Sequence, residues 1–207
     1  MTIPKLHLKY AYPLDGERRK LFADKNFGDY PSIEEVRNKV GEWKKLWSDI
    51  NKDDKIFKLL IKTIGVTLPR DLEMYIFGTG LNAMSSPLIM PIIGRNGKKF
   101  TADEFIEIVI HEIIHRFVGD LENNGNIEKY WKTIREEYKD ETILTQNHII
   151  VYAVLEIVLS ELFGKDKLKD FINSENPKHP EYQRAVATVA KKGARNLVKQ
   201  FRGIVTK

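Results

Sequence analysis

The chain has 207 residues, of which 42% are hydrophobic and 30% charged, and its net charge at pH 7 is +5. The length suits one domain, and the composition is that of a globular protein rather than a disordered chain. Cysteine is absent, which excludes disulfides, thiolate zinc sites and a cysteine nucleophile. The modest basic excess is spread along the chain, with one denser run near the C-terminus. Because no nucleic-acid-binding motif accompanies it, a solvated surface is the favoured interpretation and a nucleic-acid partner the alternative.

The chain also lacks the sequence features of export or membrane insertion. Residues 1–9 show no basic stretch followed by an apolar core, as a secretory signal requires. The longest apolar stretch, Ile149 to Phe163, is interrupted by polar residues and is shorter than the about 20 residues of a bilayer span. We therefore expect a cytoplasmic protein with no membrane partner.

The first third of the chain predicts one strand and two helices. The strand is expected at Leu6 to Tyr12, followed by a loop rich in charge and glycine. Ser32 and Glu35 form a capping box, the typical start of a helix, and apolar residues at helical spacing continue it to about Ile50. A shorter helix is expected at Lys55 to Ile64.

Two further strands are predicted before the middle of the chain. The first covers Leu72 to Phe77, and the second covers Pro87 to Ile93. Because proline cannot donate a ladder hydrogen bond, Pro87 and Pro91 place the second strand at a sheet edge. The glycine-containing segment 78–83 resembles a nucleotide-binding fingerprint, but no helix can follow it directly, so we interpret it as a turn between the strands.

The second half of the chain predicts helices throughout. Thr101 and Glu104 form another capping box, which begins a helix that runs to about Val118. Three more helices are expected, at about Ile127 to Tyr138, Thr142 to Phe163 and Pro180 to Phe201. Together these elements predict an α+β fold, mostly helical, with a small sheet preceding the central helix. We treat 1–207 as one domain, with an N-terminal lobe of about 1–118 and a helical lobe of about 119–207.

The central helix contains the sequence His111-Glu112-Ile113-Ile114-His115. Residues four apart lie above one another on a helix, so both imidazoles can reach one metal ion. Glu112 is then placed to act as general base, accepting a proton from a metal-bound water. These ionisable residues interrupt an apolar helix, where burial without partners costs several kcal/mol. Metal coordination would supply the partners.

This motif resembles that of the zincin metallopeptidases, in particular the gluzincins. The resemblance implies a zincin-like fold, a Zn²⁺ cofactor and a peptide or protein substrate. Zincins hold the substrate backbone along a strand that precedes the motif helix, and the segment 86–93 resembles that strand. Between two prolines, Ile89 alone could both donate and accept there, which makes it the candidate substrate-binding residue. The alternative is that the prolines only protect the edge from aggregation.

A catalytic zinc usually takes a third protein ligand and keeps one position open. His148 is our first candidate, because it follows Asn147 at a polar helix start, where gluzincins place a glutamate. Glu156 is the alternative third ligand, eight residues further along the same helix. The region of Asp120 and Glu122 ranks last, because its spacing does not match the metzincin pattern.

We therefore expect a zinc metallopeptidase in which Glu112 activates the attacking water. Tyr152 lies one turn after His148 and could hydrogen-bond the oxyanion, or it could simply pack in the core. The alternative function is a non-catalytic protein-binding module with a structural metal or none. Cobalt, nickel or iron would also suit these ligands. The sequence does not define the natural substrate, the regulation or the oligomeric state.

Overall fold

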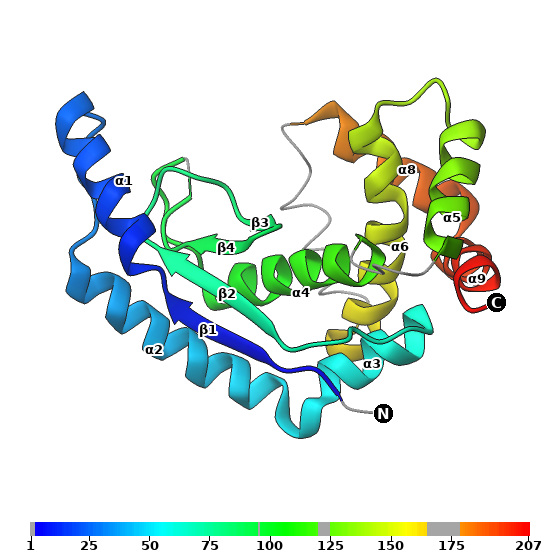
Figure 1. Ribbon diagram of the computed structural model, residues 1–207, viewed down its shortest axis with the longest axis horizontal. Helices are drawn as coiled ribbons and strands as arrows, with labels where there is room; N and C mark the ends of the chain where they lie inside the picture. The colour runs from blue at the N-terminus through cyan, green and yellow to red at the C-terminus, as the bar shows by residue number, and fades with distance from the viewer. Residues whose placement is uncertain (1–2, 95, 120–124, 165–178) are drawn as a thin grey trace. The chain divides into compact units, whose positions relative to one another are not determined.

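The computed structural model describes residues 3–94, 96–119, 125–164 and 179–207 (Figure 1). It is mostly helical with one four-stranded mixed sheet, which confirms the predicted α+β class. The chain divides into two compact units, 1–55 with 69–112, and 56–68 with 113–207. The division thus falls inside the motif helix, and the segment 56–68 joins the C-terminal unit, which differs from the lobes expected from sequence.

The sheet belongs to the N-terminal unit and has the order β1-β2-β4-β3. Its strands are β1 (Leu6–Tyr10), β2 (Leu72–Phe77), β3 (Met84–Ser85) and β4 (Leu88–Pro91). β1, β2 and β4 run parallel to one another, and β3 pairs antiparallel with β4. The glycine-containing segment after β2 therefore does not form a hairpin between β2 and β4. It leads to β3, from which the chain turns back into β4.

The edge position predicted for Ile89 is wrong. Ile89 lies opposite Tyr75 of β2 on one side and Met84 of β3 on the other. The prolines are tolerated because β3 pairs only with Leu88 and Ile89 of β4. The missing N–H of Pro91 therefore falls beyond the end of β3, where no ladder bond is needed. This two-residue edge strand left no periodic signal in the sequence.

Residues 12–25 form helix α1 (Tyr12–Lys25), where the sequence predicted a loop. Pro13 lies in its first turn, where a missing N–H costs nothing. The helix carries no apolar stripe, and Asp15 is its only buried residue. Hydrophobic periodicity could not detect such a helix, because its one buried side chain is a carboxylate and its apolar contacts, through Leu14 and Phe22, form no continuous stripe.

Asp15 is fully buried and accepts four hydrogen bonds. Oδ2 accepts from Tyr10 Oη at 2.7 Å and Arg19 Nη2 at 3.0 Å, and Oδ1 accepts from Tyr30 Oη at 2.8 Å and the Gly78 amide at 2.7 Å. A side chain at position 78 would clash, since a Cβ there would lie 2.3 Å from the Tyr30 ring. This cluster, the Asp15 cage, attaches α1 to the end of β2.

The helices with capping signals are confirmed. α2 (Ile33–Ile50) begins with both bonds of its capping box, and α4 (Ala102–Gly119) likewise begins with reciprocal bonds between Thr101 and Glu104. α2 buries its apolar face alongside β1 (Figure 1). Trp43 of this face stacks on Phe105 of α4, with ring centroids 4.3 Å apart. The 3₁₀ turn η1 (Lys52–Asp54) leads to α3 (Lys55–Ile64), which has the predicted bounds.

The C-terminal unit is built around α6 (Ile143–Phe163), which packs against α8 (Pro180–Lys192) and α9 (Ala194–Val205), with α5 (Gly125–Glu137) against α9 (Figure 1). The single last helix predicted from sequence is thus two helices. The chain breaks at Gly193, whose φ of +83° is incompatible with a continuing α-helix.

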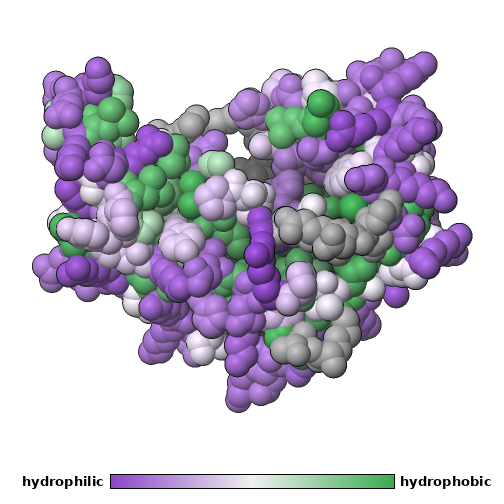
Figure 2. Space-filling view, viewed as in Figure 1, coloured by the Kyte–Doolittle hydropathy of each residue, from purple (hydrophilic) through white to green (hydrophobic). Residues whose placement is uncertain are grey.

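α6 is longer than the apolar stretch identified in the sequence, because it begins at Ile143. By length and composition alone it could cross a membrane. Most of its apolar stretch is buried within the protein, as in the core helix of a globular unit. Hydrophilic residues cover most of the face seen in Figure 2, with smaller hydrophobic patches among them.

Candidate metal centre

Two of the histidines predicted to bind metal lie one turn apart on α4. The helix continues through His111 and His115 without a break, although the boundary between the two units falls at residues 112 and 113. Both imidazoles are partly buried. Their i, i+4 spacing places them on the same face of one helix, so their relative position follows from the helix itself.

His148 reaches this pair from the second turn of α6. It is 6% exposed, and its Nδ1 lies 2.8 Å from the carbonyl oxygen of Leu144, one turn earlier. A carbonyl can only accept, so Nδ1 carries the proton and Nε2 keeps its lone pair. This is the arrangement by which proteins orient a metal-binding imidazole. Nε2 of His148 lies 3.2 Å from Nε2 of His115.

His111, His115 and His148 together offer three nitrogen atoms that all lie within 4.8 Å of one another. Zinc binds imidazole nitrogen at about 2.0–2.1 Å, so two nitrogens on a tetrahedral ion are separated by about 3.4 Å. The 3.2 Å between His115 and His148 is close to this value. The same distance also suits an N–H···N hydrogen bond between two neutral rings, so these two histidines alone do not indicate a metal site. The group is a candidate metal centre because His111 adds a third ligand atom.

Burial keeps the imidazoles of His115 and His148 in the neutral form that binds metals. Desolvation, reinforced by the neighbouring His148, lowers the pKa of His115 from 6.5 to about 3. Desolvation also lowers the pKa of His148, and the bond to the Leu144 carbonyl opposes this shift in part. At neutral pH neither ring would have to release a proton on binding a metal ion. The residues present therefore fit zinc, and they would fit other divalent metals that favour imidazole.

Glu112, the predicted general base, follows His111 directly on α4. Its side chain is 9% exposed, and its neighbours Ile110 and Ile113 are fully buried. It is not one of the three clustered ligands. The arrangement thus combines three imidazoles with a buried carboxylate, that of Glu112, which follows His111 directly on α4.

Two tyrosines lie beside His148. The ring of Tyr152 is centred 5.8 Å from the His148 ring, and that of Tyr182, on α8, is centred 4.6 Å from it. Tyr152 is 5% exposed. Of the two roles considered for it from the sequence, this burial favours packing in the core. Tyr182 was missed by sequence reasoning, because nothing local connects it to a residue 34 positions earlier.

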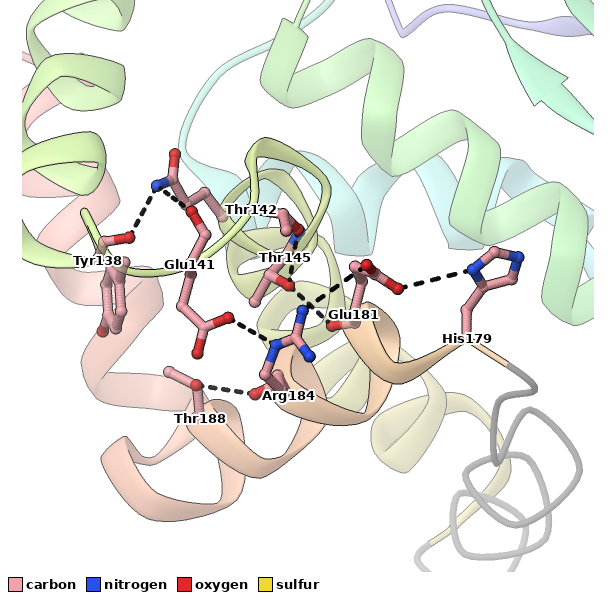
Figure 3. Close-up of polar contacts among 9 residues, drawn as sticks. Tyr138, Glu141, Thr142, Thr145, His179, Glu181, Arg184 and Thr188 are labelled. Carbon is pink, nitrogen blue, oxygen red and sulfur yellow. Dashed lines mark hydrogen bonds and ion pairs between the residues drawn. The ribbon is translucent and has the colours of Figure 1, made fainter.

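A polar network fixes the start of α8 against the start of α6 (Figure 3). Arg184 Nε donates to Glu141 at 2.7 Å, and Thr145 Oγ1 donates to the Glu181 carbonyl at 3.2 Å. Gln146 Nε2 also donates to the Glu141 carbonyl at 3.0 Å. These contacts hold Tyr182 and His148 in the same part of the C-terminal unit.

The other predicted site residues lie apart from the three histidines. Glu156 is two turns beyond His148, about 12 Å along α6, and burial raises its pKa. Ile89 lies inside the sheet, 5% exposed. Asp120 and Glu122 fall outside the described residues. Among the residues that the structure describes, the clustered ligand set contains His148 and not Glu156.

Comparisons of this chain with protein-family models, with curated proteins and with solved structures find no match.

Proposed function

We propose that this protein is a metal-dependent hydrolase that uses zinc to cleave peptide bonds. The observation that carries the proposal is the convergence of His111, His115 and His148, whose ligand atoms lie within 4.8 Å of one another. Glu112, adjacent to the first of them, supplies a carboxylate where such chemistry needs a base. The resemblance of this motif to that of the zincins supports peptide hydrolysis as the reaction class.

Zinc at this position would supply Lewis-acid chemistry, polarising the scissile carbonyl and lowering the pKa of water toward 7. The protein's own contribution is to hold the three imidazoles in place and to keep those of His115 and His148 neutral. The Leu144 carbonyl accepts the Nδ1 proton of His148 and so directs the free Nε2 toward the other two rings. The hydrogen bond limits rotation of the His148 ring. The lowered pKa values of His115 and His148 mean that protons do not compete with the metal ion for their nitrogen atoms at neutral pH.

Glu112 has two proton-transfer roles in this proposal. It accepts the proton of the attacking water as the new carbon–oxygen bond forms. It then returns that proton to the leaving amine as the carbon–nitrogen bond breaks. The carboxylate is thereby regenerated at the end of each turnover. A glutamine at this position could accept no proton, although it would preserve the shape of the side chain.

The experiment measures zinc content and hydrolysis on the same purified samples. Zinc-loaded protein is desalted, its metal is measured by plasma mass spectrometry, and its activity is followed by mass spectrometry of a defined peptide mixture. We expect about one zinc per wild-type chain. Glu112→Gln should keep the zinc and lose activity by about 10²–10⁴-fold. His111→Ala should lose both, whereas Glu128→Gln, at an exposed position on α5, should lose neither.

The outcomes separate the hydrolase from its rival. A wild-type protein that binds no zinc would overturn the proposal. Wild-type activity in Glu112→Gln would also contradict it, since the carboxylate would then have no part in the chemistry. Stoichiometric zinc with no cleavage of any peptide would instead support a protein-binding module with a structural metal.

A further inference from the structure

A pocket of about 310 Å³ lies entirely within the C-terminal unit, between α3, α6 and α9. Its polar lining contains four cationic side chains, those of Lys62, Arg195, Lys199 and Arg202, and a single carboxylate, that of Glu161. Counting these five groups, the lining carries a net charge of +3. Such an excess of one sign in a concave surface concentrates the field and attracts anions.

The carboxylate neutralises little of this charge. Lys62 Nζ lies 3.9 Å from Glu161, at the limit of an ion pair, and the two side chains are 77% and 38% exposed. Exposed pairs of this kind contribute at most about 1 kcal/mol and hold their partners loosely. Lys62 therefore stays available to a ligand that offers a stronger negative charge.

Arg202 is held in place by the end of α3. Its Nη1 donates to the carbonyl oxygen of Lys62 at 3.1 Å, which satisfies one of the last carbonyls of that helix. The side chain passes close over Gly65, where a Cβ would come within 2.9 Å of Nε. A guanidinium carries five N–H donors, and this contact uses one. This contact with the end of α3 thus helps to orient an otherwise exposed cation.

The remaining lining gives the pocket a second chemical character. Arg195, Lys199 and Arg202 are spaced by four and three residues, so they follow one face of α9. The lining also includes two apolar side chains, Ile157 of α6 and Val198 of α9. The pocket therefore combines cationic side chains with apolar ones.

We propose that this pocket binds a phosphate monoester that carries an apolar or aromatic body. The two arginines offer the forked donors that match phosphate oxygens, and the net charge suits a group with a charge near −2. The volume is at the lower end of small-molecule sites. The site is separate from the metal centre, because Ile157 lies nine residues after His148, about 14 Å along α6. The proposal therefore does not depend on the proposed hydrolase activity.

Calorimetric titration with phenyl phosphate tests the site directly. We expect wild-type protein to bind phenyl phosphate more tightly than inorganic phosphate, and to show no binding of phenol, which has the ring without the phosphate. Arg195→Ala/Lys199→Ala removes two exposed cations of the pocket and should weaken binding at least tenfold. The matched control Lys44→Ala/Lys45→Ala removes two exposed cations from α2 and should leave the affinity unchanged.

Vesicles of phosphatidylcholine with and without phosphatidic acid distinguish a lipid phosphate from a soluble one. Binding of phenyl phosphate together with the acidic vesicles would support a lipid headgroup as ligand, and binding of phenyl phosphate alone would support a soluble monoester. The proposal fails if wild-type protein does not bind phenyl phosphate, whatever the vesicles show. It also fails if the two double variants weaken binding equally, because the affinity would then depend on the net charge of the protein and not on the cations of the pocket.

Discussion

The Nε2 atoms of His115 and His148 lie 3.2 Å apart, although 33 residues separate the two histidines in the chain. His148 is buried and His115 is partly buried, and desolvation lowers the pKa of both. With His111 one turn earlier on α4, the pair forms the one group of clustered ligands within the described residues. This contact between α4 and α6 is the relationship on which the proposed metal centre depends.

The first prediction concerns the third ligand. His148→Ala should weaken zinc affinity by at least about 100-fold, because even residues that only support a ligand cost 10–100-fold. Glu156→Ala should change the affinity less than twofold, since Glu156 is two turns away along α6. Competition with a chromogenic chelator measures both constants. A larger loss in Glu156→Ala than in His148→Ala would assign the third ligand to Glu156.

The second prediction concerns metal removal. Zinc that binds only the folded protein should add about 2.7 kcal/mol to the free energy of unfolding at 100 times its Kd. For a chain of this size that corresponds to a rise in Tm of about 5–10 °C. Thermal denaturation should show this rise in wild-type protein, and a chelator should reverse it. The control variant His7→Ala, which removes a histidine outside the clustered ligands, should show the same rise. His115→Ala should show no rise, and an equal rise there would place the zinc elsewhere.

The third prediction concerns the Asp15 cage. Asp15→Asn keeps the side-chain shape but removes the charge and directs two N–H groups at existing donors. We expect the free energy of unfolding to fall by about 3–5 kcal/mol, as when a buried ion pair loses one partner. Urea denaturation measures the change. Asp24→Asn, at an exposed position on the same helix, is the control and should stay within about 0.5 kcal/mol of wild type.

The fourth prediction concerns alkaline pH. Burial, helped by the hydrogen bond to Asp15, raises the pKa of Tyr10 to about 12, whereas an unfolded tyrosine ionises near 10. Below pH 10 both states keep the proton. Between pH 10 and 12 only the unfolded state releases it, so stability is lost as the pH rises.

Phenylalanine cannot ionise, so the comparison with Tyr10→Phe isolates this effect from other groups that titrate at alkaline pH. The stability difference between wild type and Tyr10→Phe should be constant from pH 7 to 9 and should shrink from pH 10 to 12. Urea denaturation at each pH gives that difference. A constant difference up to pH 12 would show that Tyr10 ionises alike in both states.

The sequence by itself determined the elements whose signals are local. The capping boxes at Ser32 and Thr101 marked the starts of α2 and α4 because their hydrogen bonds span only three residues. The i, i+4 histidines of α4 could be recognised for the same reason, since one helical turn defines their relation. Apolar periodicity likewise located α3, because its buried face repeats within a single helix.

Only the tertiary structure decided the features that depend on distant partners. Glu156 had the ligand type of the resembling family, but the packing of α6 brings His148 rather than Glu156 to His115. α1 had no apolar stripe, because its buried contact is a carboxylate whose donors include Tyr30 and the Gly78 amide. Ile89 does not lie at the sheet edge, because the two-residue strand β3 pairs with β4 there. Such contacts join residues far apart in the chain, so local sequence patterns cannot predict them.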